Sequence, residues 1–276
     1  DVMGVADCGW GMLFARSAQE AADLALVARR AAEESETPFF NVQDGFLTTH
    51  TIESLQLPEP ELMKEFVGDP NSEHRLRNLM NPTHPIMSGV VQNQDSYMKG
   101  KIAQRFFYER LPAIVQQVME RFYDLTGRRY RMADPHRLQG AEYALVGMGS
   151  LLETASATVD YLRDREKLKV GSLHVTCYRP FPGPQIVEAL KHVKAVAVFE
   201  RMDDPSAQSN PLTAQIKAAF ADALAGAPGY PRIKRVPIIY SGAAGLGSRD
   251  VRPGDFVAVV NHMRKQKEQR FFVLGI

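Results

Sequence analysis

The chain has 276 residues, of which 45% are hydrophobic and 24% are charged, and this ordinary globular composition excludes wholesale disorder. At roughly 100–200 residues per domain, the length predicts two domains. The formal charge of +1 balances 33 basic against 32 acidic residues, so no net field favours nucleic acid or an anionic membrane as a partner. Two cysteines are too few for a disulfide framework, a zinc finger or a four-cysteine iron–sulfur site.

The two ends of the chain carry no targeting signal. The chain begins Asp1-Val2-Met3, without the basic and then apolar pattern of a signal peptide. It ends in the strand-like apolar run 271–276, whereas C-termini are usually polar and frayed. No apolar run approaches the roughly 20 residues that span a bilayer. We therefore expect a soluble, cytoplasmic segment of a longer protein, with no membrane partner.

Helix and strand signals in the first half predict an α/β domain. Ser17 and Glu20 form an S-x-x-E capping box, which predicts a helix to about residue 32. Residues 38–42 predict a short strand, and Asp44-Gly45 predicts the turn that ends it.

The middle of the chain is less regular. Residues 53–90 are rich in Pro, Glu and Asn, and they predict a long connection that carries short helices. Pro112 is predicted to open a helix with one apolar face, and Gly127 is placed to end it.

The charged and polar stretch that follows predicts a linker at 134–141, which separates domains of residues 1–133 and 142–276. Past the linker, buried strands alternate with helices, which implies βαβ crossovers and a mostly parallel sheet. The strands are predicted at 143–147, 171–178, 195–200, 236–241 and 271–275, and the helices at 150–163, 184–191 and 213–225.

Two glycine-rich runs are candidate ligand loops. Gly147-x-Gly149-Ser150 follows a strand and opens a helix, where backbone N–H groups can bind a phosphate. The third position of that fingerprint is Leu152 rather than glycine, so a plain turn is favoured, and Ser150 with Glu153 predicts a second capping box. The run 242–248 lacks the Gly-Lys-Ser/Thr ending of a P-loop and predicts a tight turn or a close backbone approach.

Motifs of common hydrolases are missing. The seven histidines form neither His-x-x-x-His nor His-Glu-x-x-His, and the sequence has no Gly-x-Ser-x-Gly elbow. His50 follows a predicted strand end, which is where open α/β sheets bind ligands. A loop histidine bonded to backbone is nevertheless the favoured interpretation of His50.

Short motifs recur in order along almost the whole chain. In the first half they are Asp1-Val2-Met3, Gly9-Trp10-Gly11-Met12-Leu13, Ser17-Ala18-Gln19-Glu20-Ala21, Asp44-Gly45-Phe46-Leu47-Thr48-Thr49-His50 and Gln92-Asn93-Gln94-Asp95-Ser96-Tyr97. In the second half they are Gly147-Met148-Gly149-Ser150 with Glu153-Thr154, Tyr178-Arg179-Pro180-Phe181 and Gly245-Leu246-Gly247-Ser248-Arg249-Asp250. Together, at this spacing, they resemble the pyruvate:ferredoxin (flavodoxin) oxidoreductase family.

The resemblance implies an incomplete pyrimidine-binding-type thiamine domain over residues 1–133 and a transketolase C-terminal-like domain over 142–276. It implies a whole enzyme, expected as a homodimer, that splits a 2-oxo acid with thiamine diphosphate and Mg. Such an enzyme forms acyl-CoA and passes electrons through iron–sulfur clusters to ferredoxin or flavodoxin. The family's thiamine-activating residues and cluster cysteines lie outside this segment. We therefore expect no catalytic residue, no metal ligand and no fully bound cofactor here.

The same resemblance predicts what the segment contributes, namely the rim of the active site or dimer contacts through Trp10, Asp44, Thr48 and His50. The sequence also departs from the family pattern, and each departure loses a charged or polar family residue. The replacements are Ala6-Asp7-Cys8 for Arg-Gln-Thr, Leu47 for Arg, Thr51 for Glu, and Asp203-Asp204-Pro205-Ser206-Ala207 for a Lys-Glu-Pro-Gly loop. Leucine cannot replace the bidentate carboxylate partner that arginine provides, so the identity of the 2-oxo acid stays open.

The leading hypothesis is therefore a segment of a thiamine-dependent 2-oxoacid:ferredoxin/flavodoxin oxidoreductase. One alternative is a non-catalytic structural or interaction module that descends from that family, which the departures at Ala6-Asp7-Cys8 and Leu47 favour. The other is a non-redox transketolase-type transferase. Regions that distinguish these alternatives lie outside the chain.

Overall fold

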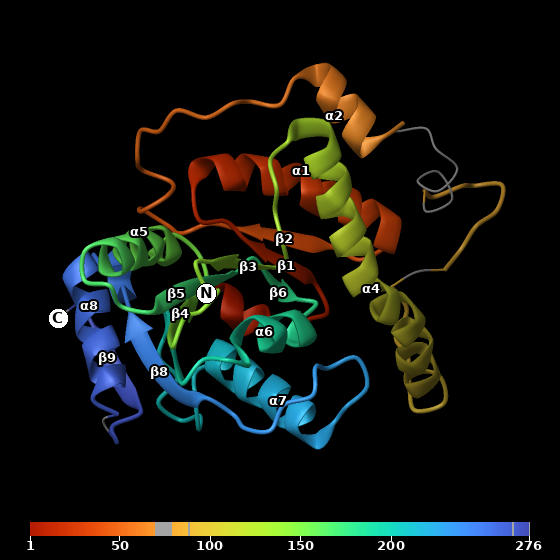
Figure 1. The fold of residues 1–276 in the computed structure, drawn as a ribbon. Coiled ribbons are helices and arrows are strands. Elements are labelled where there is room, and N and C mark those ends of the chain that lie inside the picture. Colours follow the sequence, from red (N-terminus) through yellow and green to blue (C-terminus); the bar gives the residue numbers. More distant parts are fainter. Residues whose placement is uncertain (70–78, 88, 267, 276) are drawn as a thin grey trace.

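The computed structural model describes residues 1–69, 79–87, 89–266 and 268–275, which form two β-sheets with helices packed around them (Figure 1). The strands are β1 (Gly11–Phe14), β2 (Phe39–Val42), β3 (Ala133–His136), β4 (Tyr143–Gly147), β5 (Val170–Val175), β6 (Cys177–Arg179), β7 (Ala195–Glu200), β8 (Ile238–Ala244) and β9 (Phe271–Leu274). The helices are α1 (Ala18–Ser35), α2 (Pro60–Val67), α4 (Tyr97–Thr126), α5 (Leu151–Asp164), α6 (Gly183–Leu190), α7 (Pro211–Ala225) and α8 (Pro253–Arg264), with 3-10 turns η1 (Val2–Val5) and η2 (Leu246–Ser248).

The larger sheet, sheet B, has the strand order β3-β5-β4-β7-β8-β9. All neighbouring pairs are parallel except β3 with β5, so the expected α/β fold with a mostly parallel sheet is confirmed. Helices α6 and α7 cover one face, and α5 and α8 cover the other (Figure 1). Because both faces are covered, strands such as β5 and β7 are buried along their whole length, and β7 reads as a nearly continuous apolar run. We call sheet B with these four helices the second unit.

The parallel strands of sheet B have a topological switch point. Taken in chain order, β4, β5, β7, β8 and β9 occupy the spatial order second, first, third, fourth, fifth. The connection that leaves β4 runs toward β5 and the one that leaves β7 runs the opposite way toward β8, so a crevice forms at the carboxyl ends of β4 and β7. In folds of this kind, that crevice is the usual place for a ligand.

The smaller sheet, sheet A, has the order β2-β1-β6 and belongs mainly to the first half of the chain. Strands β1 and β2 are parallel, and α1, α2 and α4 pack against them around a core that includes Leu24, Phe66 and Phe122. We call β1, β2 and these three helices the first unit. The third strand, β6, follows β5 directly in the chain but pairs antiparallel with β1. The β5–β6 segment therefore passes directly from sheet B to sheet A and joins the two units.

That crossing explains one difference from the sequence prediction. A single strand was expected at 171–178, whereas the chain forms β5 in sheet B and β6 in sheet A, separated by Thr176. The Phe14 N–H donates to the Thr176 carbonyl at 2.7 Å, so the junction residue is itself bonded to the first unit. Apolar side chains continue through both strands, and the sequence pattern does not mark the change of sheet.

Part of the predicted linker is also regular structure. Ala133–His136 form β3, which pairs with β5 at the edge of sheet B, with Asp134 opposite His174. An edge strand has one unpaired side and so tolerates Pro135, which suggested a linker in the sequence. The domain boundaries at 133 and 142 stay a prediction.

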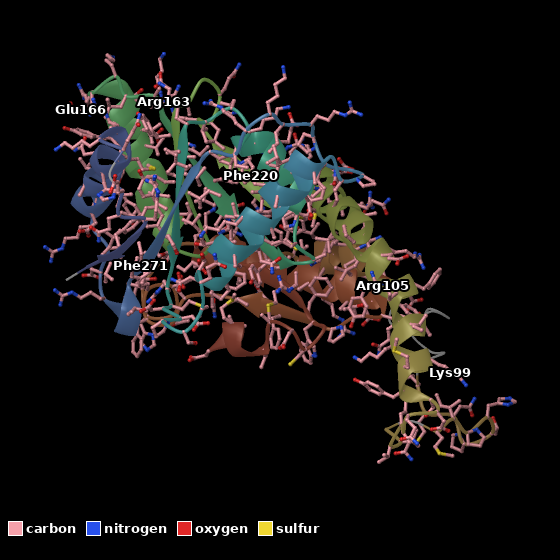
Figure 2. All side chains as sticks on the ribbon, turned by 90° about the horizontal axis from the view of Figure 1, so that it is seen from below. Lys99, Arg105, Arg163, Glu166, Phe220 and Phe271 are labelled. Carbon is pink, nitrogen blue, oxygen red and sulfur yellow. The ribbon has the colours of Figure 1, made fainter. Side chains whose placement is uncertain are left out.

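Helix α4 begins far earlier than predicted. It starts at Tyr97, and Pro112, expected to open it, lies inside it; Gly127 ends it in the left-handed conformation, as predicted. The first half carries exposed apolar side chains such as Ile102 and Phe106, so it has no buried stripe that periodicity could detect. In Figure 2, Lys99 and Arg105 mark this half where it projects away from both sheets.

The bounds of the other elements can be compared with the remaining predictions. Strand β2, helices α6 and α7, and strands β4, β7, β8 and β9 occur where they were expected, within a few residues. Strand β1 and helix α8 were not predicted. The long connection contains the short helix α2, in agreement with the prediction that it carries short helices. Residues 70–78 and 88 of this connection lie outside the described residues. Within the described ranges, no helix has the length and apolar character to cross a membrane.

Candidate functional site

A cavity of about 660 Å³ lies at the switch point, between the two units. The first unit contributes residues that follow β2, and the second contributes residues at the carboxyl ends of β4, β7 and β8. Its wall includes Asp44, Phe46, Met148, Glu200, Arg201, Gly245 and Gly247, with η1 beside them. The strand ends of both units therefore meet at one cavity, as expected for a ligand crevice in an α/β fold.

A carboxylate from the first unit binds the start of a helix in the second. Asp44 Oδ2 accepts hydrogen bonds from the Ser150 N–H and the Ser150 hydroxyl, both at 2.6 Å. On its other side, Asp44 Oδ1 lies 3.2 Å from Arg201 Nη1. Arg201 Nη2 donates to the Gly245 carbonyl at 3.3 Å, which ties the ends of β7 and β8 together. Asp44 thus bridges three segments that are far apart in the sequence.

This contact corrects the second predicted capping box. Ser150 is the N-cap of α5, but its backbone is helical and its side chain makes no capping hydrogen bond. The Glu153 N–H donates to the Ser150 carbonyl, and the Ser150 hydroxyl donates to Asp44. The first predicted box is confirmed at its serine, since Ser17 Oγ accepts from the Glu20 N–H at 3.3 Å. The Glu20 carboxylate accepts from the Arg16 N–H at 2.7 Å, one residue before the cap.

Gly149 has to be glycine for two reasons. Its φ of +71° lies in the left-handed region, where a side chain is strained. A Cβ at this position would also lie 2.6 Å from Asp44 Oδ2. The glycine recognised in the sequence therefore makes room for a carboxylate of the same chain.

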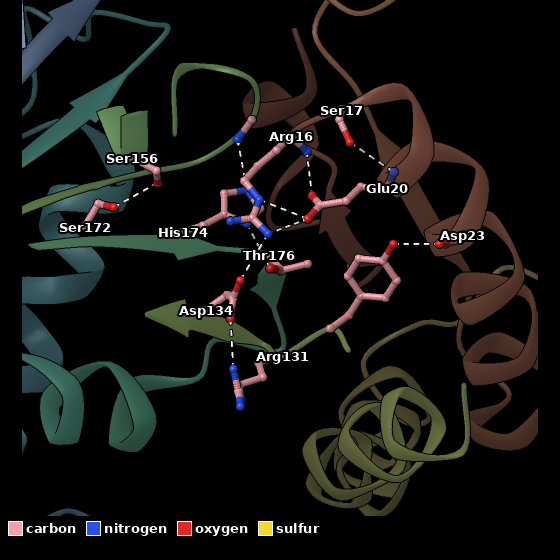
Figure 3. Close-up of polar contacts among 12 residues, drawn as sticks. Arg16, Ser17, Glu20, Asp23, Arg131, Asp134, Ser156, Ser172, His174 and Thr176 are labelled. Carbon is pink, nitrogen blue, oxygen red and sulfur yellow. Dashed lines mark hydrogen bonds and ion pairs between the residues drawn. The ribbon is translucent and has the colours of Figure 1, made fainter. Parts of the chain in front are cut away.

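The second backbone donor of this turn, the Gly149 N–H, is bound by a buried histidine (Figure 3). Gly149 N–H donates to His174 Nε2 at 3.3 Å, and His174 Nδ1 lies 3.0 Å from Thr176 Oγ1. Because Nε2 accepts, the proton resides on Nδ1 and the ring is neutral. Burial, together with the nearby Arg16 guanidinium, holds the pKa of His174 well below its usual range. Protonation would place two N–H groups against each other at Gly149.

Arg16 joins the units on the far side of His174 (Figure 3). It donates to Glu20 of α1 at 2.6 Å and to Asp134 of β3 at 3.0 Å. The described residues therefore include two charged bridges between the units, one at Arg16 and one at Asp44.

Glu200, in the cavity wall, has a structural role of the same kind. It is 2% exposed and accepts hydrogen bonds from the N–H groups of Leu212 and Thr213, at 2.7 and 3.0 Å, and from the Thr213 hydroxyl. Burial raises the pKa of its carboxyl, although these hydrogen bonds oppose the shift. The starts of α5 and α7 at this edge of the sheet are thus both bound to carboxylates of the chain.

Three of the four predicted site residues, Asp44, Thr48 and His50, lie in one loop, but Asp44 alone among the four lines this cavity. Asp44 lies in the cavity wall. Thr48 is buried, and its Oγ1 has no hydrogen-bond partner among the described residues. His50 is exposed, stacks on the Phe46 ring with centroids 4.7 Å apart, and has Nδ1 2.8 Å from Thr49 Oγ1.

Trp10 stacks on Phe40 at 4.5 Å and does not line this cavity. The sequence analysis missed Arg201, whose only signal was its position directly after the buried strand β7. Leu47, which replaces the family's arginine, is partly buried in the same loop as Thr48. Whether the four predicted residues form an active-site rim or a dimer contact stays a prediction.

The described residues show no ready metal site. Within this part of the chain, no three His, Cys, Asp or Glu side chains gather closely enough to hold an ion. Cys177 is buried, and burial raises the pKa of its thiol far above the usual range, whereas Cys8 is exposed.

Comparisons with known proteins match both halves of the chain. Residues 1–120 match the family model described as "Pyruvate flavodoxin/ferredoxin oxidoreductase, thiamine diP-bdg". Residues 141–256 match the model described as "Pyruvate:ferredoxin oxidoreductase core domain II". The interval between the two matches contains β3 and all but the last residue of the predicted linker.

Individual relatives match over the whole chain. It is 35% identical over 277 residues to the pyruvate-flavodoxin oxidoreductase of Klebsiella pneumoniae and 33% identical over 277 residues to the pyruvate:ferredoxin oxidoreductase of Moorella thermoacetica. Both alignments cover 100% of this chain and 23% of the relative, so the chain spans less than a quarter of their length. A 2-oxoglutarate:ferredoxin oxidoreductase structure from Magnetococcus marinus is 19% identical, covering 59% of this chain and 23% of that chain; its TM-score of 0.36 supports no structural argument.

Proposed function

Because the chain belongs to the pyruvate:ferredoxin (flavodoxin) oxidoreductase family, we propose that the protein containing it oxidises a 2-oxo acid to an acyl-CoA. The observation that carries this proposal is 35% identity over the full length of the chain to one such enzyme. Electrons would leave through iron–sulfur clusters to ferredoxin or flavodoxin, and thiamine diphosphate with Mg would act as the electron sink. Relatives that are named for flavodoxin and for ferredoxin match the chain almost equally well, so the acceptor stays open.

The residues of the cavity do not fit a diphosphate of thiamine. The turn before α5 would be the natural cradle, but its Gly149 and Ser150 N–H groups already donate to His174 and Asp44. The Asp44 carboxylate also places negative charge where a phosphate would lie. We therefore derive no catalytic step through the cofactor at this turn, and we assign its binding to parts of the protein outside this chain.

Within that protein, this chain would act as the scaffold that joins a thiamine-type unit to the second unit. Two features support this role: the β5–β6 crossing between sheets, and the charged bridges at Arg16 and Asp44. The cavity's guanidinium, Arg201, forms an ion pair with Asp44 and donates to the Gly245 carbonyl, while its Nη1 has no hydrogen-bond partner among the described residues. A homodimer in the cytoplasm remains part of the proposal.

The test uses the full-length protein. We expect a polypeptide well above 30.8 kDa with bound iron, which reduces a viologen dye when supplied with a 2-oxo acid and CoA together. Omitting CoA is the control for dye reduction that does not complete the acyl transfer. A protein with iron but no activity on any 2-oxo acid would favour the non-catalytic module. A protein without iron that transfers two-carbon units between sugars would favour the transketolase-type alternative.

A second test isolates the segment. We expect residues 1–276 alone not to bind thiamine diphosphate tightly, because no open diphosphate cradle lies in the cavity. Titration calorimetry with thiamine diphosphate and Mg measures this directly. Submillimolar affinity would contradict the assignment of the cofactor site to other parts of the protein.

A further inference from the structure

The start of α5 has the chemistry of an anion site. The free N–H groups and aligned peptide dipoles of a helix N-terminus attract negative charge. Here the Ser150 hydroxyl is a further hydrogen-bond donor, and the Arg201 guanidinium adds a full positive charge at the same point. Gly149, lacking a Cβ, leaves the space in which an anion can approach the backbone. We call these three residues the cradle.

An anion fills the cradle, and it comes from 106 residues away in the sequence. Asp44 offers one oxygen to Ser150 and the other to Arg201. The Asp44 and Arg201 side chains are only 18% and 17% exposed, so solvent screens the pair weakly. Charge-assisted hydrogen bonds in such surroundings are among the stronger polar contacts in proteins.

The backbone of Asp44 supports the loop that follows it. Its carbonyl accepts from the Thr48 N–H at 3.2 Å, and the Phe46 N–H is bound by Thr49 Oγ1 at 2.9 Å. Phe46 has a φ of +63°, which is strained for a bulky residue and persists only when its surroundings fix it. The Phe46–Thr49 and Asp44–Thr48 hydrogen bonds lie around this residue, in a loop that contributes Gly45 and Phe46 to the cavity wall.

We infer that Asp44 is a tethered ligand: its carboxylate occupies an anion-binding cradle of the second unit and thereby holds loop 44–50 of the first unit in place. Asp44 is a positioning residue in this role and takes no part in chemistry. The cradle would accept a free small carboxylate if Asp44 were removed. This inference does not depend on the proposed enzymatic activity, because it concerns the geometry of the cavity wall.

The experiment is hydrogen exchange, followed by mass spectrometry, on the full-length protein and its Asp44→Ala variant. We expect amide exchange to become at least about tenfold faster both at residues 147–151 and at 44–50, because each segment loses a charge-assisted contact. Millimolar sodium acetate, at constant ionic strength, should restore protection at 147–151 in this variant. It should not restore loop 44–50, since a free anion has no covalent link to that loop.

Two variants serve as controls. Asp44→Asn fills the cradle with a neutral group of equal size, so it should show faster exchange at 147–151 but no response to acetate. Asp134→Ala removes a carboxylate that binds the side chains of Arg16 and Arg131 rather than a backbone N–H at a helix start, and it should not respond to acetate either. Asp44→Asn also provides the measurement if Asp44→Ala fails to fold.

Three results would overturn the inference. The first is unchanged exchange at 44–50 in both Asp44 variants. The second is a folded Asp44→Ala variant whose residues 147–151 gain no protection from acetate. The third is equal acetate protection in Asp134→Ala, which would make the response non-specific.

Discussion

Two helices of this chain begin with the same sequence signature and are capped in different ways. The start of α1 carries Ser17 and Glu20, and its serine side chain caps the helix locally. The start of α5 carries Ser150 and Glu153, yet its serine binds Asp44 of the other unit and caps nothing. Both starts lie near a contact between units, but only α5 has a carboxylate delivered to its end.

The difference shows that a capping-box sequence predicts only the hydrogen bonds that a helix start can form with its own side chains. A local side chain offers one neutral acceptor, whereas Asp44 offers a charged acceptor together with an ion pair to Arg201. Where the tertiary fold brings a charged acceptor to a helix start, it replaces the weaker local cap. At α1 the nearby carboxylate is Glu20 itself, and it binds Arg16 while Ser17 keeps the cap.

The largest expected effect comes from breaking the charged bridge at α5. Asp44→Ala should lower the free energy of local opening around Ser150 by about 3 kcal/mol, because it leaves the partly buried Arg201 without its counter-charge. Glu20→Ala should cost less around α1, since Arg16 keeps Asp134 as a partner. Hydrogen exchange measures both in the full-length protein. Equal costs would remove the distinction between the two helix starts.

The Ser150 hydroxyl should be worth more than an ordinary cap. Ser150→Ala removes a hydrogen bond to a charged acceptor, and we expect a loss of about 2 kcal/mol in opening free energy at residues 147–151. Ser150→Thr, which retains the hydroxyl, is the matched control. A loss as small as that of a neutral cap would show that Asp44 is held by the backbone N–H and Arg201 alone.

The turn before α5 should also depend on pH through His174. Its pKa is lowered in the folded protein from an ordinary value of 6.5, so below about pH 6.5 the unfolded state binds a proton that the folded state does not. Stability is therefore complete above that pH and falls on acidification, by about 1.4 kcal/mol per pH unit. His174→Gln should remove this part of the slope, measured by exchange at Gly149 and corrected for intrinsic rates. A slope unchanged from wild type would assign it to other groups; the exposed His50→Gln is the control.

The smallest effect is expected at the local cap. Ser17→Ala should cost about 1 kcal/mol in the opening of the first turn of α1, a typical value for a lost N-cap. Ser17→Asp, another good N-cap, should preserve protection there. If Ser17→Ala instead perturbed residues 147–151 as strongly as Ser150→Ala, the two helix starts would be coupled rather than independent.

Much of the fold could be predicted because its strands are buried on both faces. Continuous apolar runs at β4, β7 and β8 have few alternatives to a covered parallel sheet, and the elements around them followed. The failures have a common cause. The first half of α4 has no buried stripe, and β3 is a polar edge strand, so neither left a periodic signal.

The candidate site was predictable only in part. Asp44 was selected as a rim residue, and the structure places it in the cavity wall, yet its partners Ser150 and Arg201 were assigned to other roles or overlooked. The glycine turn was favoured as a plain turn over a phosphate site, and in the structure its N–H groups donate to His174 and Asp44. The reason, a carboxylate from the other unit already bound there, lies in no local pattern.

By itself the sequence determined the α/β class, the helices with one buried face, and the glycine needed at position 149. These follow from side-chain periodicity and backbone sterics, which act over a few neighbouring residues. Only the tertiary structure decided which sheet β6 joined and which carboxylate reached the start of α5. Contacts between residues far apart in the chain depend on how the sheets pack together, and charge-assisted bonds formed there outweigh the weaker local alternatives.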